Sequence, residues 1–129
     1  MISHLLASLS VIATTYGYGE KSCYSRFLAQ PVSCLRGLST ATGENFDPLK
    51  PTFAMYVPKT RRIRSQWIGL KVKGSAKCVW LWLNDRKPKL GLDLTPGALK
   101  KLGIKPNSTW SGMLQLCTPN TNHQTLIFN

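Results

Sequence analysis

Short stretches of β-branched and aromatic residues recur along this chain, separated by glycine, proline and lysine turn signals. Short strands at this spacing are typical of a closed β-barrel or a β-sandwich. Val79, Leu81 and Leu83 share one face of a strand, because side chains alternate along it. Trp80 and Trp82 share the other, and we expect one of the two faces to lie in the core. The predicted strands cover residues 11–18, 52–57, 63–72 and 78–83, with a closing strand within 109–117.

One helix is well marked near the end of this pattern. Thr95 can cap it, Pro96 stands at its first position, and Gly103 follows its end. Its apolar stripe consists of Ala98, Leu99 and Leu102. Between the first two strands the periodic pattern is lost, and we expect a long loop insertion over about residues 20–43.

The length of 129 residues is enough for one hydrophobic core and too short for two, so residues 1–129 are predicted to form a single domain. Four cysteines allow three disulfide pairings, and a Cys23–Cys34 bridge could pin the long loop. Four buried thiols are an equally good interpretation. No cysteine or histidine spacing typical of zinc occurs, so we expect no metal.

The charge of the chain is strongly positive, with 17 Lys and Arg against five acidic residues and a net charge of +12. Nucleic acid, anionic lipid and the anionic bacterial wall are the natural partners of such a surface, although a basic surface can also serve solubility alone. The apolar start, residues 1–13, has no Lys or Arg before its apolar run and is not a convincing signal peptide. No stretch reaches the roughly 18 to 20 apolar residues of a membrane span.

Two blocks of sequence resemble the rare lipoprotein A family. In that family a strand ends in Asn-Asp-Arg-Gly-Pro, and Asp-Leu-Ser/Thr and a helix ending in Leu-Gly follow. Lys87 stands where the family has Gly, and residues 40–54 are similar to the family's Thr-Ala-x-Gly-Glu-x-Phe-Asp stretch. The matching residues of the first block are Asn84, Asp85, Arg86, Pro88, Asp93, Leu94, Thr95, Leu102 and Gly103.

The resemblance implies a mainly β fold, a six-stranded double-psi β-barrel with one or two short helices, as in expansins, barwins and family 45 endoglucanases. It also implies a lytic transglycosylase-like protein that cleaves peptidoglycan glycan strands without a cofactor. We expect it at the cell wall or periplasm, or in a virion. A basic wall-active domain without a signal would suit a phage-encoded protein that also contacts other virion or tail proteins.

Four of the five carboxylates fall on acidic positions of the family motif: Glu44, Asp47, Asp85 and Asp93. Glycosidic cleavage needs a carboxylic acid to protonate the leaving oxygen and usually a second group as base or stabiliser. The resemblance makes Asp93 the acid. Asp85 is expected at the end of the adjacent strand, facing the same groove, with Glu44 and Asp47 assisting.

Each of these carboxylates also has a purely structural interpretation. Asp85 could form an ion pair with Arg86 in a tight turn, and Asp93 could stabilise the start of the helix. Glu44 and Asp47 could belong to a solvated loop with an Asp-Pro turn.

A departure from the family pattern favours a protein without catalysis. Lytic members have a histidine eleven residues after the motif glutamate, and this position is Met55, whose thioether cannot transfer a proton. The alternative to an enzyme is therefore a wall-binding or virion/tail structural barrel module.

Aromatic and basic residues supply the candidate glycan contacts, which are Trp80, Trp82, Arg86 and Tyr16. Strand tryptophans can equally pack the barrel. A second basic group could meet wall phosphates, carboxylates or nucleic acid, or protect a strand edge. Nucleic acid is the less favoured partner because no nucleic-acid module is recognisable. This group comprises Lys59, Arg61, Arg62 and Arg64.

Overall fold

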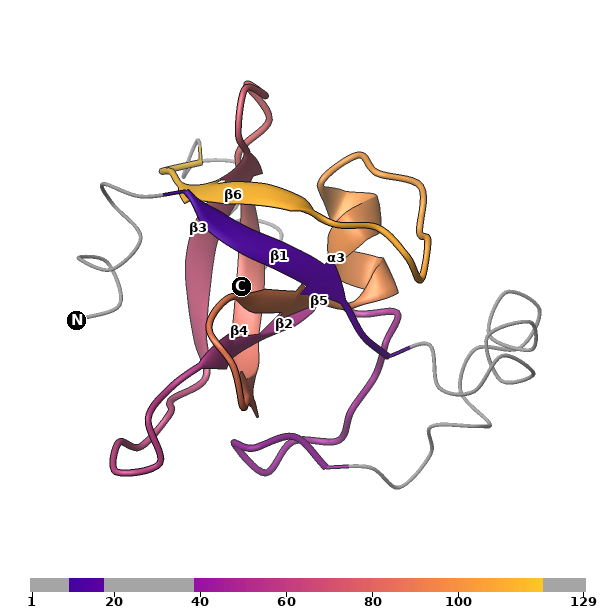
Figure 1. Cartoon of the computed structure of the whole chain (residues 1–129). Helices are drawn as coiled ribbons and strands as arrows, with labels where there is room; N and C mark the ends of the chain where they lie inside the picture. The colour runs from indigo at the N-terminus through magenta and orange to yellow at the C-terminus, as the bar shows by residue number, and fades with distance from the viewer. Residues whose placement is uncertain (1–9, 18–38, 120–129) are drawn as a thin grey trace.

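The computed structural model describes residues 10–17 and 39–119. This part of the chain forms a closed six-stranded barrel in the order β1-β5-β2-β4-β3-β6, with one short helix (Figure 1). The prediction of a mainly β, six-stranded barrel with one or two short helices is confirmed. The elements are β1 (Val11–Thr15), β2 (Thr52–Tyr56), β3 (Gln66–Val72), β4 (Val79–Lys87), β5 (Leu92–Leu94), α3 (Pro96–Lys101) and β6 (Gly112–Leu116).

The strand pairing of the barrel is mixed and repeats itself. β1 is parallel to β5, β2 is parallel to β4, and the other neighbours are antiparallel. The two halves of the chain pair in the same way. If β1 is exchanged with β4, β2 with β5 and β3 with β6, the same set of parallel and antiparallel pairs results. This internal repeat places β2 and β5 side by side.

The core is formed by the inward side chains of all six strands. Val79 is 6% exposed, and Leu81 and Leu83 are fully buried, whereas Trp80 and Trp82 are half-buried on the outside. The prediction that this strand has one core face is confirmed. Other core residues are Ala13, Phe53, Leu70, Leu92, Leu94 and Leu114.

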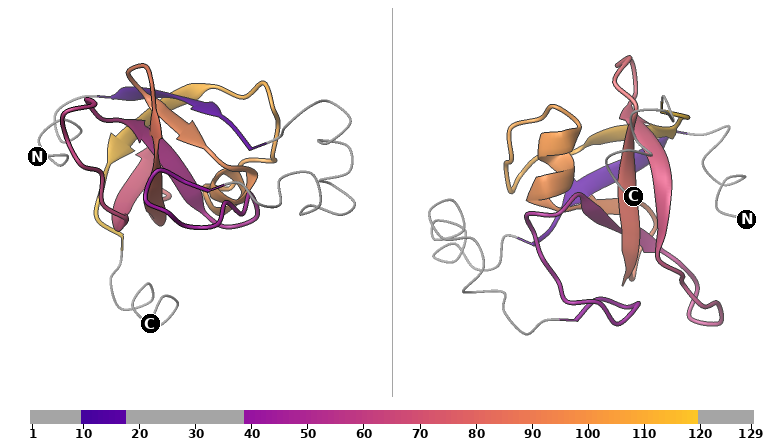
Figure 2. Two further views of the ribbon diagram at one scale, coloured as in Figure 1. Left: turned by 90° about the horizontal axis from the view of Figure 1, so that it is seen from below. Right: turned by 180° about the vertical axis from the view of Figure 1, so that it is seen from behind.

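The helix α3 begins as the sequence predicts. The buried Thr95 hydroxyl accepts a hydrogen bond from the Ala98 amide at 3.1 Å, and Pro96 follows this cap. Gly97 packs against the backbone after Asp47, where an added Cβ would lie 2.3 Å from the Leu49 carbonyl oxygen. The helix and the segment between β2 and β3 lie on opposite sides of the barrel (Figure 2).

Three sequence expectations need correction. The strand β5 was missed, because three residues are too few to show a period. The strand β4 continues beyond residue 83 to Lys87, so the Asn-Asp-Arg motif is part of a strand. β5 is not the neighbour of β4, because β2 lies between them.

A disulfide joins Cys78, just before β4, to Cys117, just after β6. These two strands flank β3, and the Cys117 amide donates to the Gly69 carbonyl in β3 at 3.0 Å. The bridge therefore ties three neighbouring strands together. The Cys23–Cys34 pairing and residues 18–38 of the predicted loop lie outside the described residues.

Candidate active site

Four residues on four adjacent strands form a continuous row across the outer surface of the barrel. Thr14 pairs with Asp93, Asp93 with Ala54, and Ala54 with Asp85. Directly paired residues project from the same face of a sheet. Both neighbours of Asp93 in β5 are core leucines, so this face is the outer one. We call these four residues the aspartate row.

A β-bulge brings Asp85 into the aspartate row. Leu83 pairs with Phe53 and Asp85 pairs with Ala54, which leaves Asn84 as the extra residue in β4. Without the bulge, alternation from the buried Leu83 would turn Asp85 inward. The Asn-Asp motif therefore supplies the irregularity that directs a carboxylate outward.

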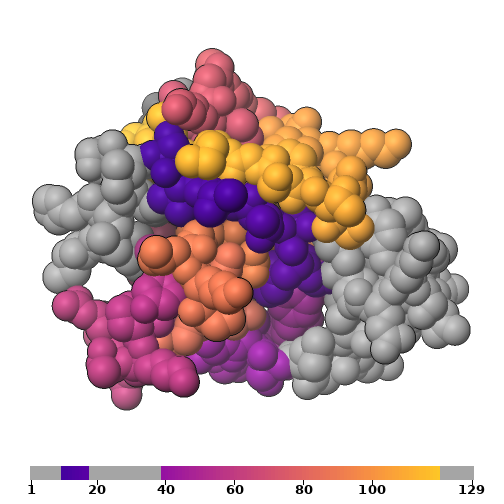
Figure 3. Space-filling model, viewed as in Figure 1, coloured from indigo at the N-terminus to yellow at the C-terminus, as the bar shows by residue number. Residues whose placement is uncertain are grey.

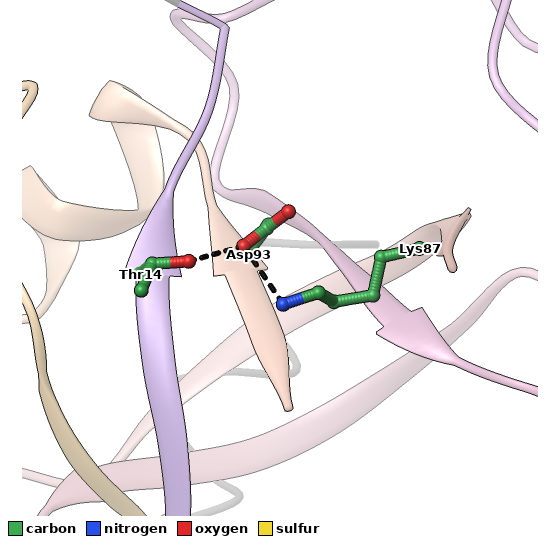
Figure 4. Close-up of polar contacts among 3 residues, drawn as sticks. All are labelled: Thr14, Lys87 and Asp93. Carbon is green, nitrogen blue, oxygen red and sulfur yellow. Dashed lines mark hydrogen bonds and ion pairs between the residues drawn. The ribbon is translucent and has the colours of Figure 1, made fainter. Parts of the chain in front are cut away.

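Asp93 is held by a hydroxyl and a cation (Figure 4). The Thr14 hydroxyl donates to its Oδ1, and the Lys87 ammonium lies 3.2 Å from the same oxygen. The side chains of Lys87 and Asp93 are 14% and 22% exposed, so this ion pair is partly shielded from water. The alternative role of Asp93 at the start of the helix is wrong, because its carboxylate binds Thr14 and Lys87 while Thr95 caps α3, whose first turn has no acidic residue.

Asp85 is held by two backbone amides. Its Oδ1 accepts hydrogen bonds from the Ala41 amide at 3.0 Å and from the Arg86 amide at 2.9 Å. The Arg86 guanidinium does not pair with it, so the predicted ion pair is wrong. The glycan contact of Arg86 stays a prediction, although its guanidinium already donates at 2.7 to 2.8 Å to the carbonyl oxygens of Val57, Pro58 and Arg61.

Tyr16 contributes a buried hydroxyl to the site. The hydroxyls of Tyr16 and Thr52 are close enough to interact with each other, and neither makes a hydrogen bond of good geometry to any other described residue. Burial raises the pKa of Tyr16, and the negative charges of Asp85 and Asp93 raise it further, so the phenol stays a proton donor.

Glu44 lies outside the aspartate row, in a dense network of donors. Its Oε1 accepts from the Trp82 indole at 2.9 Å and the Asn84 amide at 3.2 Å, and its Oε2 accepts from the Thr42 and Ser65 hydroxyls. Burial by itself would raise the pKa of Glu44, but the four hydrogen bonds outweigh it and lower the pKa below 4.5. An ionised carboxylate with four donors is better suited to holding the 40–44 turn on β4 than to transferring a proton.

Asp47 closes its own turn. Its Oδ1 accepts from the Leu49 amide at 2.9 Å, which agrees with the Asp-Pro turn interpretation. Asp47 and Glu44 also line a cavity of 460 Å³ together with Trp67 and Trp82. The four predicted carboxylates are therefore divided between two places, with Asp85 and Asp93 in the aspartate row and the other two beside this cavity.

The two predicted tryptophan platforms lie toward β3, with β2 between them and Asp93. Trp82 packs against Trp67 with ring centroids 4.8 Å apart, besides its bond to Glu44. Trp80 lines a second and larger cavity, of 740 Å³. A glycan contact by either ring stays a prediction.

Met55, which stands at the position of the family histidine, is a core residue and 5% exposed. Alternation along β2 places it on the opposite face from Ala54, the residue between the two aspartates. Sequence reasoning missed the roles of Thr14, Ala54 and Lys87. Only Lys87 carried a signal, as a charged residue where the family has Gly.

Within residues 10–17 and 39–119, no group of three or more His, Cys, Asp or Glu side chains is placed to hold a metal ion. No helix in these ranges is long and apolar enough to cross a membrane.

The protein is a closed six-stranded barrel that carries two aspartates on the outer face of its strands. A buried tyrosine hydroxyl lies near them. No family model matches the chain, and no curated protein matches it.

Proposed function

We propose that this protein is lytic transglycosylase-like and cleaves the glycan strands of bacterial peptidoglycan at the aspartate row. The observation that carries the proposal is the register that places Asp93 and Asp85 on one outer face of the barrel, with the buried Tyr16 hydroxyl close enough for both charges to raise its pKa. Two strand spacings separate the aspartates, about 10 Å between backbones, and the buried Ala54 lies between them. The residues of this surface include Asp85 and Asp93 of the block that resembles the rare lipoprotein A family.

The proposed reaction uses one acid and no cofactor. Protonated Asp93 gives its proton to the glycosidic oxygen while the bond from that oxygen to the anomeric carbon of muramic acid breaks. The 6-hydroxyl of the same muramic acid then bonds to the anomeric carbon and returns its proton to Asp93, which leaves a 1,6-anhydro end. Asp85 stabilises the developing positive charge, and Tyr16 donates to a sugar oxygen.

The place of action is the cell wall, reached in the periplasm or as part of a virion with other virion or tail proteins. The basic surface, at a net charge of +12, favours association with the anionic wall.

A second candidate function is a wall-binding or virion structural barrel without catalysis. Two observations favour it: Lys87 holds an oxygen of Asp93 in an ion pair, and Met55 points into the core instead of supplying a second proton-transfer group. A carboxylate kept in an ion pair is suited to accepting hydrogen bonds from sugar hydroxyls.

Digestion of purified peptidoglycan, followed by mass spectrometry of the soluble products, separates the two candidates. We expect anhydro-muropeptides from the wild type and a loss of about 100-fold or more in Asp93→Asn, because general acid catalysis contributes at least this factor. Lys87→Gly, which removes the cation beside Asp93, should retain or increase release. Lys89→Gly, in the exposed loop that follows β4, is the matched control.

Two results would reject cleavage. If the wild type and Lys87→Gly both sediment with the wall and release nothing, the barrel is a binding module. If Asp93→Asn releases anhydro-muropeptides at the wild-type rate, another group is the acid. Circular dichroism of each variant establishes that the barrel is intact.

A further inference from the structure

The larger cavity has an apolar wall and a basic rim. Val57, Ile63 and Leu116 are among its apolar lining residues, and three arginines complete the lining on one side. Its volume of 740 Å³ is in the range of sites that hold small ligands or several residues of a peptide. The basic residues are Arg61, Arg62 and Arg64, which are all exposed.

These three arginines have no carboxylate partner within the described part of the chain, where the one ion pair joins Lys87 to Asp93. The described carboxylates are engaged elsewhere, in the aspartate row and beside the smaller cavity. A ligand that carries carboxylates could therefore form charge-assisted hydrogen bonds here without displacing an internal partner.

The segment that carries the arginines is held in shape from inside the protein. The Arg86 guanidinium binds the carbonyl oxygens of Val57, Pro58 and Arg61, and the Arg61 amide donates to the Pro58 carbonyl at 2.9 Å. Ile63, at 9% exposed, anchors the segment to the core. A fixed segment loses less conformational entropy on binding than a flexible one.

The arginine-lined cavity borders the aspartate row. Tyr56 lines the cavity and pairs with Lys87, whose ammonium reaches Asp93. Tyr56 is two residues beyond Ala54 on the same face of β2, about 7 Å along the strand. Figure 3 shows the segment after β2 beside the loop that leads into β5, on one face of the molecule.

We propose that this cavity binds the stem peptide of peptidoglycan, with its carboxylates at Arg61, Arg62 and Arg64 and its methyl groups against the apolar wall. This inference rests on the proposed function. The stem peptide is attached to muramic acid through a lactyl group, so a glycan over the aspartate row would carry the peptide toward the neighbouring cavity. The protein then prefers glycan with stem peptides over bare glycan.

A sedimentation assay tests this preference without requiring cleavage. Two walls free of phosphate polymers are compared: intact sacculi, and sacculi from which an amidase has removed the stem peptides. The test variant is Arg61→Gln/Arg62→Gln/Arg64→Gln. Its control, Lys73→Gln/Lys77→Gln/Lys105→Gln, makes the same change in charge at exposed lysines elsewhere.

We expect the wild type and the lysine control to bind intact sacculi about tenfold or more tightly than stripped sacculi, since one charge-assisted hydrogen bond is worth that factor. The arginine variant should bind both walls equally. Equal binding of both walls by the wild type would overturn the stem-peptide site and leave glycan binding standing. Equal losses of binding in the two triple variants would show that binding depends only on the overall positive charge. This result would also overturn the stem-peptide site. No binding to either wall would reject the proposed function itself.

Discussion

At the scale of single residues, the hydroxyl of Tyr16 is a group whose contribution to ligand binding can be separated experimentally from its contribution to folding. It is buried, and apart from the neighbouring Thr52 hydroxyl it has no hydrogen-bonding group in reach within the described ranges. A group of this kind destabilises the empty protein, and its presence is explained if a ligand completes its hydrogen bonds.

We therefore predict that Tyr16→Phe leaves the free energy of unfolding unchanged or raises it by about 1 kcal/mol, because an unsatisfied polar group is removed. The Tyr16 ring keeps its packing against Phe46, with centroids 5.3 Å apart. Binding to peptidoglycan should fall. Urea unfolding and wall sedimentation measure the two effects, and a large loss of stability would instead make the hydroxyl a structural donor.

Glu44 makes stability depend on pH in the acidic range. Hydrogen bonds from Ser65, Trp82, Asn84 and Thr42 outweigh the effect of burial and lower its pKa below 4.5 in the folded state. A group with a lowered folded-state pKa stabilises the fold above its unfolded pKa, and this contribution is lost as the pH falls through the folded value.

We predict that Glu44→Gln lowers the free energy of unfolding near neutral pH by about 1 to 3 kcal/mol, because donors lose a charged acceptor. The difference from the wild type should shrink as the pH falls below 4.5. Urea denaturation at several pH values measures it. A difference that stays constant over the acidic range would show that the ionised carboxylate is not what holds the 40–44 turn.

At the scale of elements, Thr95 joins the helix to the strand that carries the aspartate row. Its hydroxyl accepts from the Ala98 amide and lies 2.8 Å from the Lys50 carbonyl and 2.9 Å from the Thr52 carbonyl. One fully buried side chain thus caps α3 and contacts the backbone at the start of β2.

We predict that Thr95→Val, which keeps the shape and removes the hydroxyl, lowers the free energy of unfolding by about 1 to 3 kcal/mol. Thr95→Ser, which keeps the hydroxyl, should lose less. Thermal and urea unfolding of both variants measure the difference. If serine were as damaging as valine, the methyl group and not the hydroxyl would be the stabilising part.

The two irregular elements beside the aspartate row act on its geometry. The bulge at Asn84 turns Asp85 outward, and the 40–44 turn covers that bulge, since the Thr42 amide donates to the Asn84 carbonyl oxygen at 3.3 Å. The Ala41 amide of the same turn binds Asp85. The motif block around residue 44 thereby supports the block around residue 85, although some forty residues separate them.

At the scale of the whole molecule, the Cys78–Cys117 disulfide closes a chain segment with a sequence separation of 39 residues. A cross-link of this span removes conformational freedom from the unfolded chain, worth about 4 kcal/mol on a chain-entropy estimate.

We predict that Cys78→Ala/Cys117→Ala lowers the free energy of unfolding by roughly 2 to 4 kcal/mol while the far-ultraviolet circular dichroism of the barrel is retained. Urea unfolding under oxidising conditions measures this loss, and the double variant leaves Cys23 and Cys34 in place. A wild-type protein with unchanged stability after reduction would indicate that the bridge does not constrain the unfolded chain.

The sequence by itself indicated a barrel or a sandwich of short strands, most strand positions, the capped helix and the core face of β4, and a family resemblance pointed to the six-stranded barrel. Alternation and cap residues act over a few neighbouring positions, so a sequence displays them directly. It also marked Asp85 and Asp93 as the residues of interest.

Only the tertiary structure decided which carboxylates share a surface. Strand order and register depend on how side chains pack across the closed barrel, and these contacts join positions far apart in the chain. Register therefore placed Ala54 between the aspartates and Met55 in the core, and brought Lys87 to Asp93. The bulge at Asn84, which no local pattern announced, directed Asp85 outward, while the donors around Glu44 gave that carboxylate a structural setting.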